Sequence, residues 1–153
     1  MFQKILWATD FSAHAQDAGR KVLDCAECAQ HAVDVVTVVD PGDLPAFLLD
    51  VPDPFVTEGE VEAVERRLDR GYEERVRSHL HEATQFLRDA GVSTTLHVRV
   101  GTPSEQIVRL ADQLGSDVIL LGAHGKHGLA GVLLGSTVDH VAERAHCPVL
   151  VVR

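Results

Sequence analysis

Glycine residues are concentrated in one segment of this sequence, residues 122–137. Five of the twelve glycines in the chain lie there, directly after the apolar run 117–121 and directly before a predicted helix. Glycine allows positive φ angles and a close approach of the backbone to a ligand. The first N–H groups of a helix have no internal partner and lie at the positive end of its dipole. Since Ser136 and Thr137 add two hydroxyl groups at the same point, the segment predicts a phosphate-binding site.

The same segment also permits a simpler interpretation, a surface loop in which Ser136 only caps the following helix. Two better-known phosphate motifs are absent. A P-loop would need glycine where the chain has Leu120, and serine or threonine where it has His127. No G-x-G-x-x-G pattern follows the first predicted strand. The sequence therefore excludes a P-loop enzyme and a standard dinucleotide site, while a surface loop and a phosphate site both stay open.

A carboxylate follows the first predicted strand, in the run Ala8-Thr9-Asp10-Phe11-Ser12. If the first and fourth strands are neighbours, Asp10 and Gly122 face each other across one crevice at the carboxyl ends of the strands. Asp10 could then accept a hydrogen bond from a ribose hydroxyl or hold a metal ion beside phosphates. It could equally cap the first helix together with Ser12. Both roles stay open.

Strand and helix patterns alternate along the chain and must position these residues. We expect five strands, at residues 4–9, 33–39, 92–100, 117–121 and 148–152, and four helices, at residues 12–32, 58–90, 103–114 and 136–145. A Thr102–Glu105 capping box with Pro103 at the first helical position opens one helix, and Gly91 ends another. This order predicts one α/β domain, residues 1–153, with a doubly wound parallel sheet and helices on both faces.

Composition narrows the possible partners and the compartment. The formal net charge is -9, so we expect no nucleic-acid partner, since such binders need a positive surface. No apolar segment is long enough to span a membrane, and three cysteines do not indicate a disulfide framework; we expect a cytoplasmic protein. Cys25, Cys28 and His31 are spread around the predicted first helix, so we expect no metal site there. The proline-rich residues 40–57 form a long loop.

Three pieces of sequence resemble the universal stress protein family. They are Thr9-Asp10-Phe11-Ser12, the pattern Gly122-x2-Gly125-x9-Gly135-Ser136-Thr137, and the final run Pro148–Val152. The glycine spacing is similar to that of the ATP-binding branch, and the resemblance covers essentially the whole chain. It implies an adenine-nucleotide alpha hydrolase-like fold, with five strands in the order 3-2-1-4-5.

The resemblance also implies a set of nucleotide-binding residues. Asp10 would lie near the ribose and phosphates, and the backbone of Val38 would meet adenine. Ala8 departs from the proline that many ATP-binding members have, but a small residue still permits contact. The side chain of His124 could contact a phosphate or lie on the surface. With Thr9 and His124 added to the positions that the resemblance implies, the full candidate set is Ala8, Thr9, Asp10, Val38, Leu121, Gly122, His124, Gly125, Gly135, Ser136 and Thr137.

Three functions are compatible with this sequence. We favour an ATP-binding regulatory module that takes ATP with Mg2+ and whose occupancy changes its contacts with an unknown protein partner, since no catalytic base or nucleophile is evident. The second is a slow Mg-dependent ATP hydrolase or phosphotransferase using Asp10, His124 and Lys126. The third is a nucleotide-free interaction protein. An apolar edge strand at Val149–Val152 predicts a homodimer through antiparallel strand pairing, as the resemblance also implies.

Overall fold

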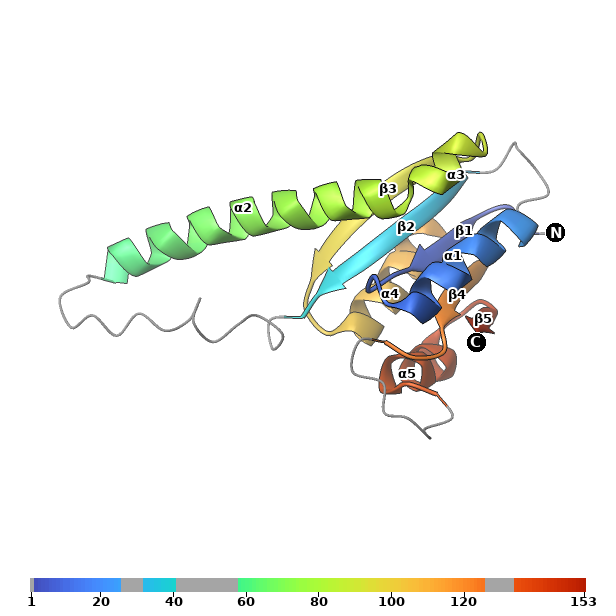
Figure 1. Ribbon diagram of the computed structural model, residues 1–153. Coiled ribbons are helices and arrows are strands. Elements are labelled where there is room, and N and C mark those ends of the chain that lie inside the picture. The colour runs from blue at the N-terminus through green and yellow to red at the C-terminus, as the bar shows by residue number, and fades with distance from the viewer. Residues whose placement is uncertain (1, 26–31, 41–57, 126–133) are drawn as a thin grey trace.

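A five-stranded parallel sheet forms the centre of the computed structural model, which describes residues 2–25, 32–40, 58–125 and 134–153. The strand order is β3-β2-β1-β4-β5, as predicted (Figure 1). The strands are β1 (Ile5–Ala8), β2 (Ala32–Val39), β3 (Ser93–Val100), β4 (Val118–Gly122) and β5 (Val149–Val152). The helices are α1 (Ala13–Cys25), α2 (Glu58–Ala83), α3 (Gln85–Asp89), α4 (Pro103–Leu114) and α5 (Ser136–Arg144).

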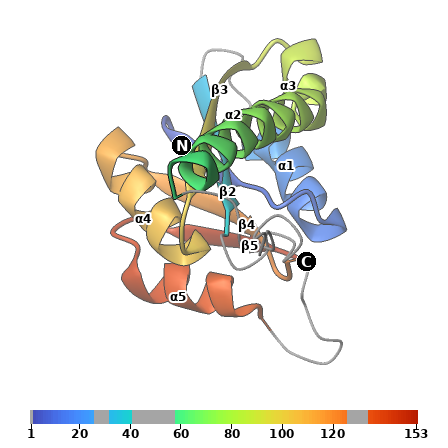
Figure 2. The same cartoon turned by 90° about the vertical axis from the view of Figure 1, so that its left-hand side faces the viewer.

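Helices cover both faces of the sheet, because successive side chains of each strand point to opposite sides. On β1, Ile5 and Trp7 pack in a cluster with buried side chains of α1, α2 and α3. Leu6 and Ala8 pack in a second cluster with buried side chains of α4 and α5. Figure 2 shows α4 and α5 together on one side of the sheet, with α1 and α2 on the other. The predicted doubly wound architecture is therefore confirmed.

The predicted single helix at residues 58–90 is wrong, because it is interrupted at Thr84. This fully buried threonine donates a hydrogen bond from its hydroxyl to the carbonyl of Leu80, at 2.7 Å. It stands between α2 and α3 as the N-cap residue of α3. The expected stop at Gly91 is confirmed, since Gly91 has φ of +79° and follows the end of α3 closely.

Two other predicted helix features differ from the structure. Thr102 is the N-cap of α4, and Pro103 follows at the first helical position, but the Thr102 side chain makes no capping hydrogen bond. The predicted capping box is therefore wrong, although the helix begins where expected. α1 is described as far as Cys25, and Ala32, near which the helix was expected to end, belongs to β2. Residues 26–31, 41–57 and 126–133 lie outside the described part of the chain, and with them most of the predicted loop at 40–57, Cys28, His31, Lys126 and His127.

Within the described ranges, none of the helices is both long enough and apolar enough to cross a membrane.

Candidate functional site

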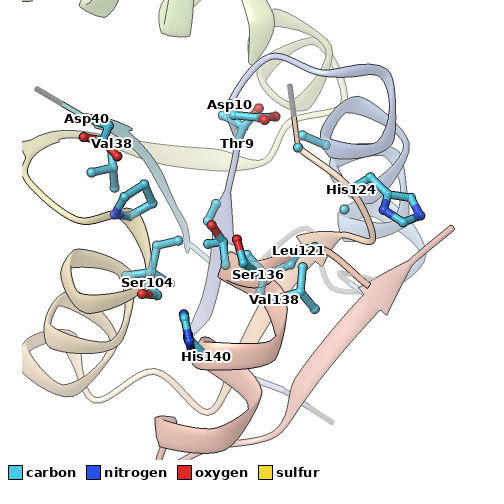
Figure 3. A pocket seen from close by; sticks show the side chains of 18 of the residues that line it. Thr9, Asp10, Val38, Asp40, Ser104, Leu121, His124, Ser136, Val138 and His140 are labelled. Atoms are coloured by element: carbon cyan, nitrogen blue, oxygen red, sulfur yellow. The ribbon is translucent and has the colours of Figure 1, made fainter. Parts of the chain in front are cut away.

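A pocket of about 610 Å³ opens at the carboxyl ends of the central strands. Figure 3 shows it between the ends of β1 and β2 and the first turns of α4 and α5. This is the edge at which the strand order reverses, since β1 lies between β2 and β4. All eleven residues predicted as site residues line this one pocket: Ala8, Thr9, Asp10, Val38, Leu121, Gly122, His124, Gly125, Gly135, Ser136 and Thr137.

The turn after β1 is held by side chains that accept backbone hydrogen bonds. The Thr9 hydroxyl accepts one from the Phe11 N–H at 3.1 Å, and an Asp10 carboxylate oxygen accepts one from the Ser12 N–H at 3.0 Å. Phe11 has φ of +66°, which is uncommon for a residue with a side chain and is stabilised here by these bonds. The Ser12 hydroxyl in turn accepts from the Ala15 N–H at the start of α1. Asp10 therefore has a structural role in the turn and also lines the pocket.

The space beside Gly122 and the space beside Gly125 are occupied by different neighbours. A Cβ atom on Gly122 would lie 2.5 Å from the backbone carbon of His14 and 2.6 Å from the Ala15 nitrogen. Gly122 thus allows the first turn of α1 to pack directly on β4. A Cβ atom on Gly125 would lie 2.8 Å from an Asp10 carboxylate oxygen. The predicted approach of Asp10 to the glycine segment therefore occurs at Gly125.

The N-terminus of α5 presents uncapped backbone amides to the pocket. Its N-cap is Gly135, which has no side chain that could pair with the first N–H groups. The first intrahelical acceptor, the Gly135 carbonyl, bonds the Asp139 N–H at 3.1 Å, so the amides of residues 136–138 have no partner in the helix. A Cβ atom on Gly135 would lie only 3.9 Å from the Gly125 nitrogen. Amides from the glycine segment and from α5 therefore converge at one end of the pocket.

The imidazole of His124 lies against α1. Its ring packs edge-on against the His14 ring with centroids 5.3 Å apart, and Figure 3 shows it directed away from Ser136. The His124 carbonyl accepts a hydrogen bond from the Ser12 hydroxyl at 3.3 Å. Its Nδ1 is buried and has no hydrogen-bond partner among the residues that the structure describes. The sequence left open whether the His124 side chain contacts a phosphate. In this geometry the ring packs against His14 and does not point toward the start of α5, which does not favour such a contact.

Sequence reasoning missed the wall that α4 and α5 contribute beyond the glycine pattern. Thr102, Pro103, Ser104 and Ile107 line the pocket from the first turns of α4, and His140 lines it from α5. A signal was available, because β3 is parallel to β2, so the helix that follows β3 must begin at the same edge of the sheet. No lysine or arginine from the described ranges lines the pocket, and its donors for an anion there are backbone amides and the side chains of residues such as Ser136 and Thr137.

Metal ligands do not cluster in the part of the chain that the structure covers. No group of three or more histidine, cysteine, aspartate or glutamate residues there is placed to hold an ion. The one cysteine described with its surroundings, Cys147, lines a separate pocket beside the C-terminal end of α4. Burial raises the pKa of its thiol, and the carboxylates of Asp112 and Asp117 raise this pKa further.

Comparisons with known proteins agree with this architecture. A model of the universal stress protein family matches residues 1–153. The universal stress protein MJ0577 of Methanocaldococcus jannaschii is 32% identical over 158 residues, covering 100% of this chain and 96% of that protein. Its solved structure has a TM-score of 0.80 to this one, with 99% and 96% of the two chains covered. A universal stress protein of Thermus aquaticus is 32% identical over 153 residues, 100% of both chains.

A further solved structure is a universal stress protein in complex with cAMP, which is 25% identical, with a TM-score of 0.64 and 99% and 97% of the two chains covered. The sheet order, the helices on both faces and these neighbours define an α/β protein of the adenine-nucleotide alpha hydrolase-like fold. Because the family model and the relatives span the whole chain, this chain belongs to the universal stress protein family, a family of stress-response proteins. The resemblance inferred from the three sequence pieces is confirmed at the level of the family.

Proposed function

We propose that this protein is a cytoplasmic regulatory module that binds ATP with Mg2+ in the pocket at the carboxyl ends of its strands. The observation that carries the proposal is the convergence of unpaired amides from α5 and the glycine segment beside Gly135. Such amides bind phosphate groups without any net positive charge on the protein. The complex of a relative with cAMP supports an adenine nucleotide as the ligand class.

The proposed orientation follows from the chemistry of the lining. The triphosphate lies at the end formed by Gly125, Gly135 and the first turn of α5, and Asp10 lies beside it. Asp10 is suited to a ribose hydroxyl or to the Mg2+ ion that accompanies ATP. The adenine then extends toward Val38 at the end of β2.

Bound nucleotide is proposed to change the contacts with a partner protein, since it would contact both Gly125 and Gly135, the residues that flank the glycine segment. A ligand that binds one arrangement of this segment more tightly than another shifts the population toward it. The same module is proposed to form a homodimer through β5, an edge strand of the sheet.

Titration calorimetry with MgATP, together with thermal unfolding, tests nucleotide binding. We expect an affinity near micromolar, because three or four hydrogen bonds to a charged group at roughly 1.5–3 kcal/mol each can supply the ~8 kcal/mol required. At a hundredfold excess over Kd, ATP should stabilise the fold by about 2.7 kcal/mol. The absence of both a binding heat and thermal stabilisation at millimolar MgATP would contradict the proposal.

A charge variant separates ligand binding from folding. Ser136→Glu places a carboxylate at the first position of α5. There the negative charge interacts favourably with the helix dipole but repels a phosphate group. We expect MgATP affinity to fall at least about tenfold, while the thermal midpoint without ligand stays equal or rises. Ser78→Glu is the matched control, since Ser78 is exposed on α2 and does not line the pocket. Equal affinity of both variants would exclude α5 as the phosphate end.

A further inference from the structure

We infer that Ser104 is a base-contacting residue, whose hydroxyl forms a hydrogen bond with the edge of the purine. This inference rests on the proposed function and adds to it the side chain that recognises the base. Ser104 is the second residue of α4 and lies on the wall of the pocket across from α5 (Figure 3).

Ser104 lines the pocket, and its hydroxyl has no partner from the protein among the described residues. The residue is only 5% exposed, and it forms no hydrogen bond with any other residue in the described part of the chain. Of the other buried residues with a hydroxyl group, Thr9 accepts from the Phe11 N–H and Thr84 donates to the Leu80 carbonyl, while Thr37 forms no side-chain hydrogen bond among the described residues. The Ser104 oxygen is not among the fully buried atoms that lack a partner, so it is accessible from the pocket. Since Ser104 lines the pocket, a ligand there can supply the missing partner.

The two helix N-termini at the pocket differ in their ability to bind phosphate. The first residue of α5 is Ser136, which has an N–H group, and Gly125 adds another amide close to Gly135. The first residue of α4 is Pro103, which has no N–H group to offer. Phosphates are therefore better bound at α5, which directs the base of the same nucleotide toward α4.

The α4 end of the pocket has the composition of a base site. Val36 is fully buried and Ile107 is 4% exposed, and both line the pocket together with Val38 and Pro103. Apolar side chains suit the faces of a neutral, flat ring, while a few placed polar groups fix its orientation. Thr102 and Asp40 also line the pocket, and beside the apolar side chains the Ser104 hydroxyl is available for the polar edge of the ring.

Titrations of three variants with two ligands test the inference. Ser104→Ala removes the hydroxyl, and Ser104→Cys replaces it with a weak hydrogen-bonding group of similar shape. Ser116→Ala is the control, because the Ser116 hydroxyl also has no partner among the described residues but lines the separate pocket near Cys147. The two ligands are MgATP and magnesium tripolyphosphate, which has the phosphates but no base.

Both Ser104 variants should bind MgATP about fivefold more weakly than the wild type, the loss expected for one neutral hydrogen bond. Tripolyphosphate affinity should stay unchanged, and so should the thermal midpoint without ligand, since no protein hydrogen bond is lost. Ser116→Ala should bind both ligands as the wild type does. MgATP affinities equal to wild type in both Ser104 variants would overturn the inference, whereas a wild-type protein that binds no MgATP would overturn the proposed function itself.

Analogues of ATP give a second readout that a structural role would not change. The set contains the 1-deaza, 3-deaza and 7-deaza analogues and purine riboside triphosphate, each of which lacks one polar group of the adenine edge. Wild type and Ser104→Ala should have the same affinity for the analogue that lacks the contacted group. In that complex the Ser104 hydroxyl has no hydrogen bond with the base that the substitution could remove. A fivefold difference that persists with every analogue would contradict a direct contact.

Discussion

Gly122 and Gly125 belong to one sequence pattern but face different neighbours. The space beside Gly122 is filled by the backbone of α1 at His14 and Ala15. The space beside Gly125 is filled by the end of the Asp10 side chain. Backbone packed in a helix cannot move aside easily, whereas a carboxylate can rotate away. The first glycine therefore serves the fold, and the second serves the position of a pocket residue.

Alanine substitutions at these two positions should separate stability from ligand binding. Gly122→Ala should lower the free energy of unfolding by about 1–3 kcal/mol, the usual cost of inserting a methyl group into tight packing. Gly125→Ala should change it far less, because only the Asp10 carboxylate has to shift, but it should weaken the binding of MgATP. Urea unfolding and calorimetry on both variants measure the two effects. Comparable destabilisation by both variants would show that the distinction is wrong.

The break between α2 and α3 depends on Thr84, a residue with polar contacts in an otherwise apolar environment. Its hydroxyl donates to the Leu80 carbonyl at 2.7 Å and accepts from an Arg88 guanidinium nitrogen at 2.9 Å. Leu80 and Leu87, on either side of the break, are fully buried in the cluster that covers one face of the sheet. The break thus lets both helices direct apolar residues at the same core.

Thr84→Val tests the contribution of these hydrogen bonds at nearly constant shape. We expect the free energy of unfolding to fall by about 1–2 kcal/mol, because the Leu80 carbonyl and Arg88 each lose a bond in or near the core. Thr94→Val on β3 is a suitable control, since Thr94 is only partly buried and makes no hydrogen bond through its side chain within the described ranges. An equal effect of both substitutions in chemical unfolding would argue against a special role of Thr84.

The elements that sequence reasoning predicted well are those with a strong local signal. β2 follows from a run of β-branched residues, the start of α4 from Pro103, and the start of α5 from the glycine pattern ending at Gly135. The break at Thr84 escaped prediction because its cause is tertiary: a buried hydroxyl that bonds the preceding turn. The same limit applies to the missing cap at Thr102, where the sequence pattern was present but the side chain does not form the bond.

The pocket shows the same division between local pattern and tertiary packing. Its glycine segment and Asp10 were predicted from motifs and from the resemblance, and the structure brings these residues together. Ser104 and His140 belong to no such pattern and were found only once α4 and α5 were placed around the pocket. The position of the His124 ring against His14 likewise depends on the packing of α1, which no local signal in the glycine segment reveals.

The two edges of the sheet give the molecule two places at which another chain could pair. β3 and β5 are the outer strands, and each carries one exposed apolar residue, Val100 at 62% and Leu150 at 39%. Unpaired edge strands tend to pair with one another unless a charged side chain prevents it. The proposed homodimer uses β5, the edge at which the sequence Val149–Val152 is apolar throughout.

Lysine substitutions at the two edges test this choice. Leu150→Lys should shift the protein from dimer to monomer in light scattering at micromolar concentration, since a lysine on an edge strand opposes strand pairing. Val100→Lys makes the same change on β3 and should leave the molar mass unchanged. A wild-type protein that is monomeric at this concentration, or a dimer that only Val100→Lys disrupts, would contradict pairing through β5.

The residues around the pocket are drawn from almost the entire length of the polypeptide, from Ala8 to His140. No fragment shorter than this span contains all of the lining residues, so the proposed nucleotide site would be complete only in a molecule whose whole domain is folded. Under heat or another denaturing stress, the fraction of molecules with bound nucleotide would then follow the fraction that is still folded. A partner that recognises only the loaded form would in this way measure how much of the protein has survived.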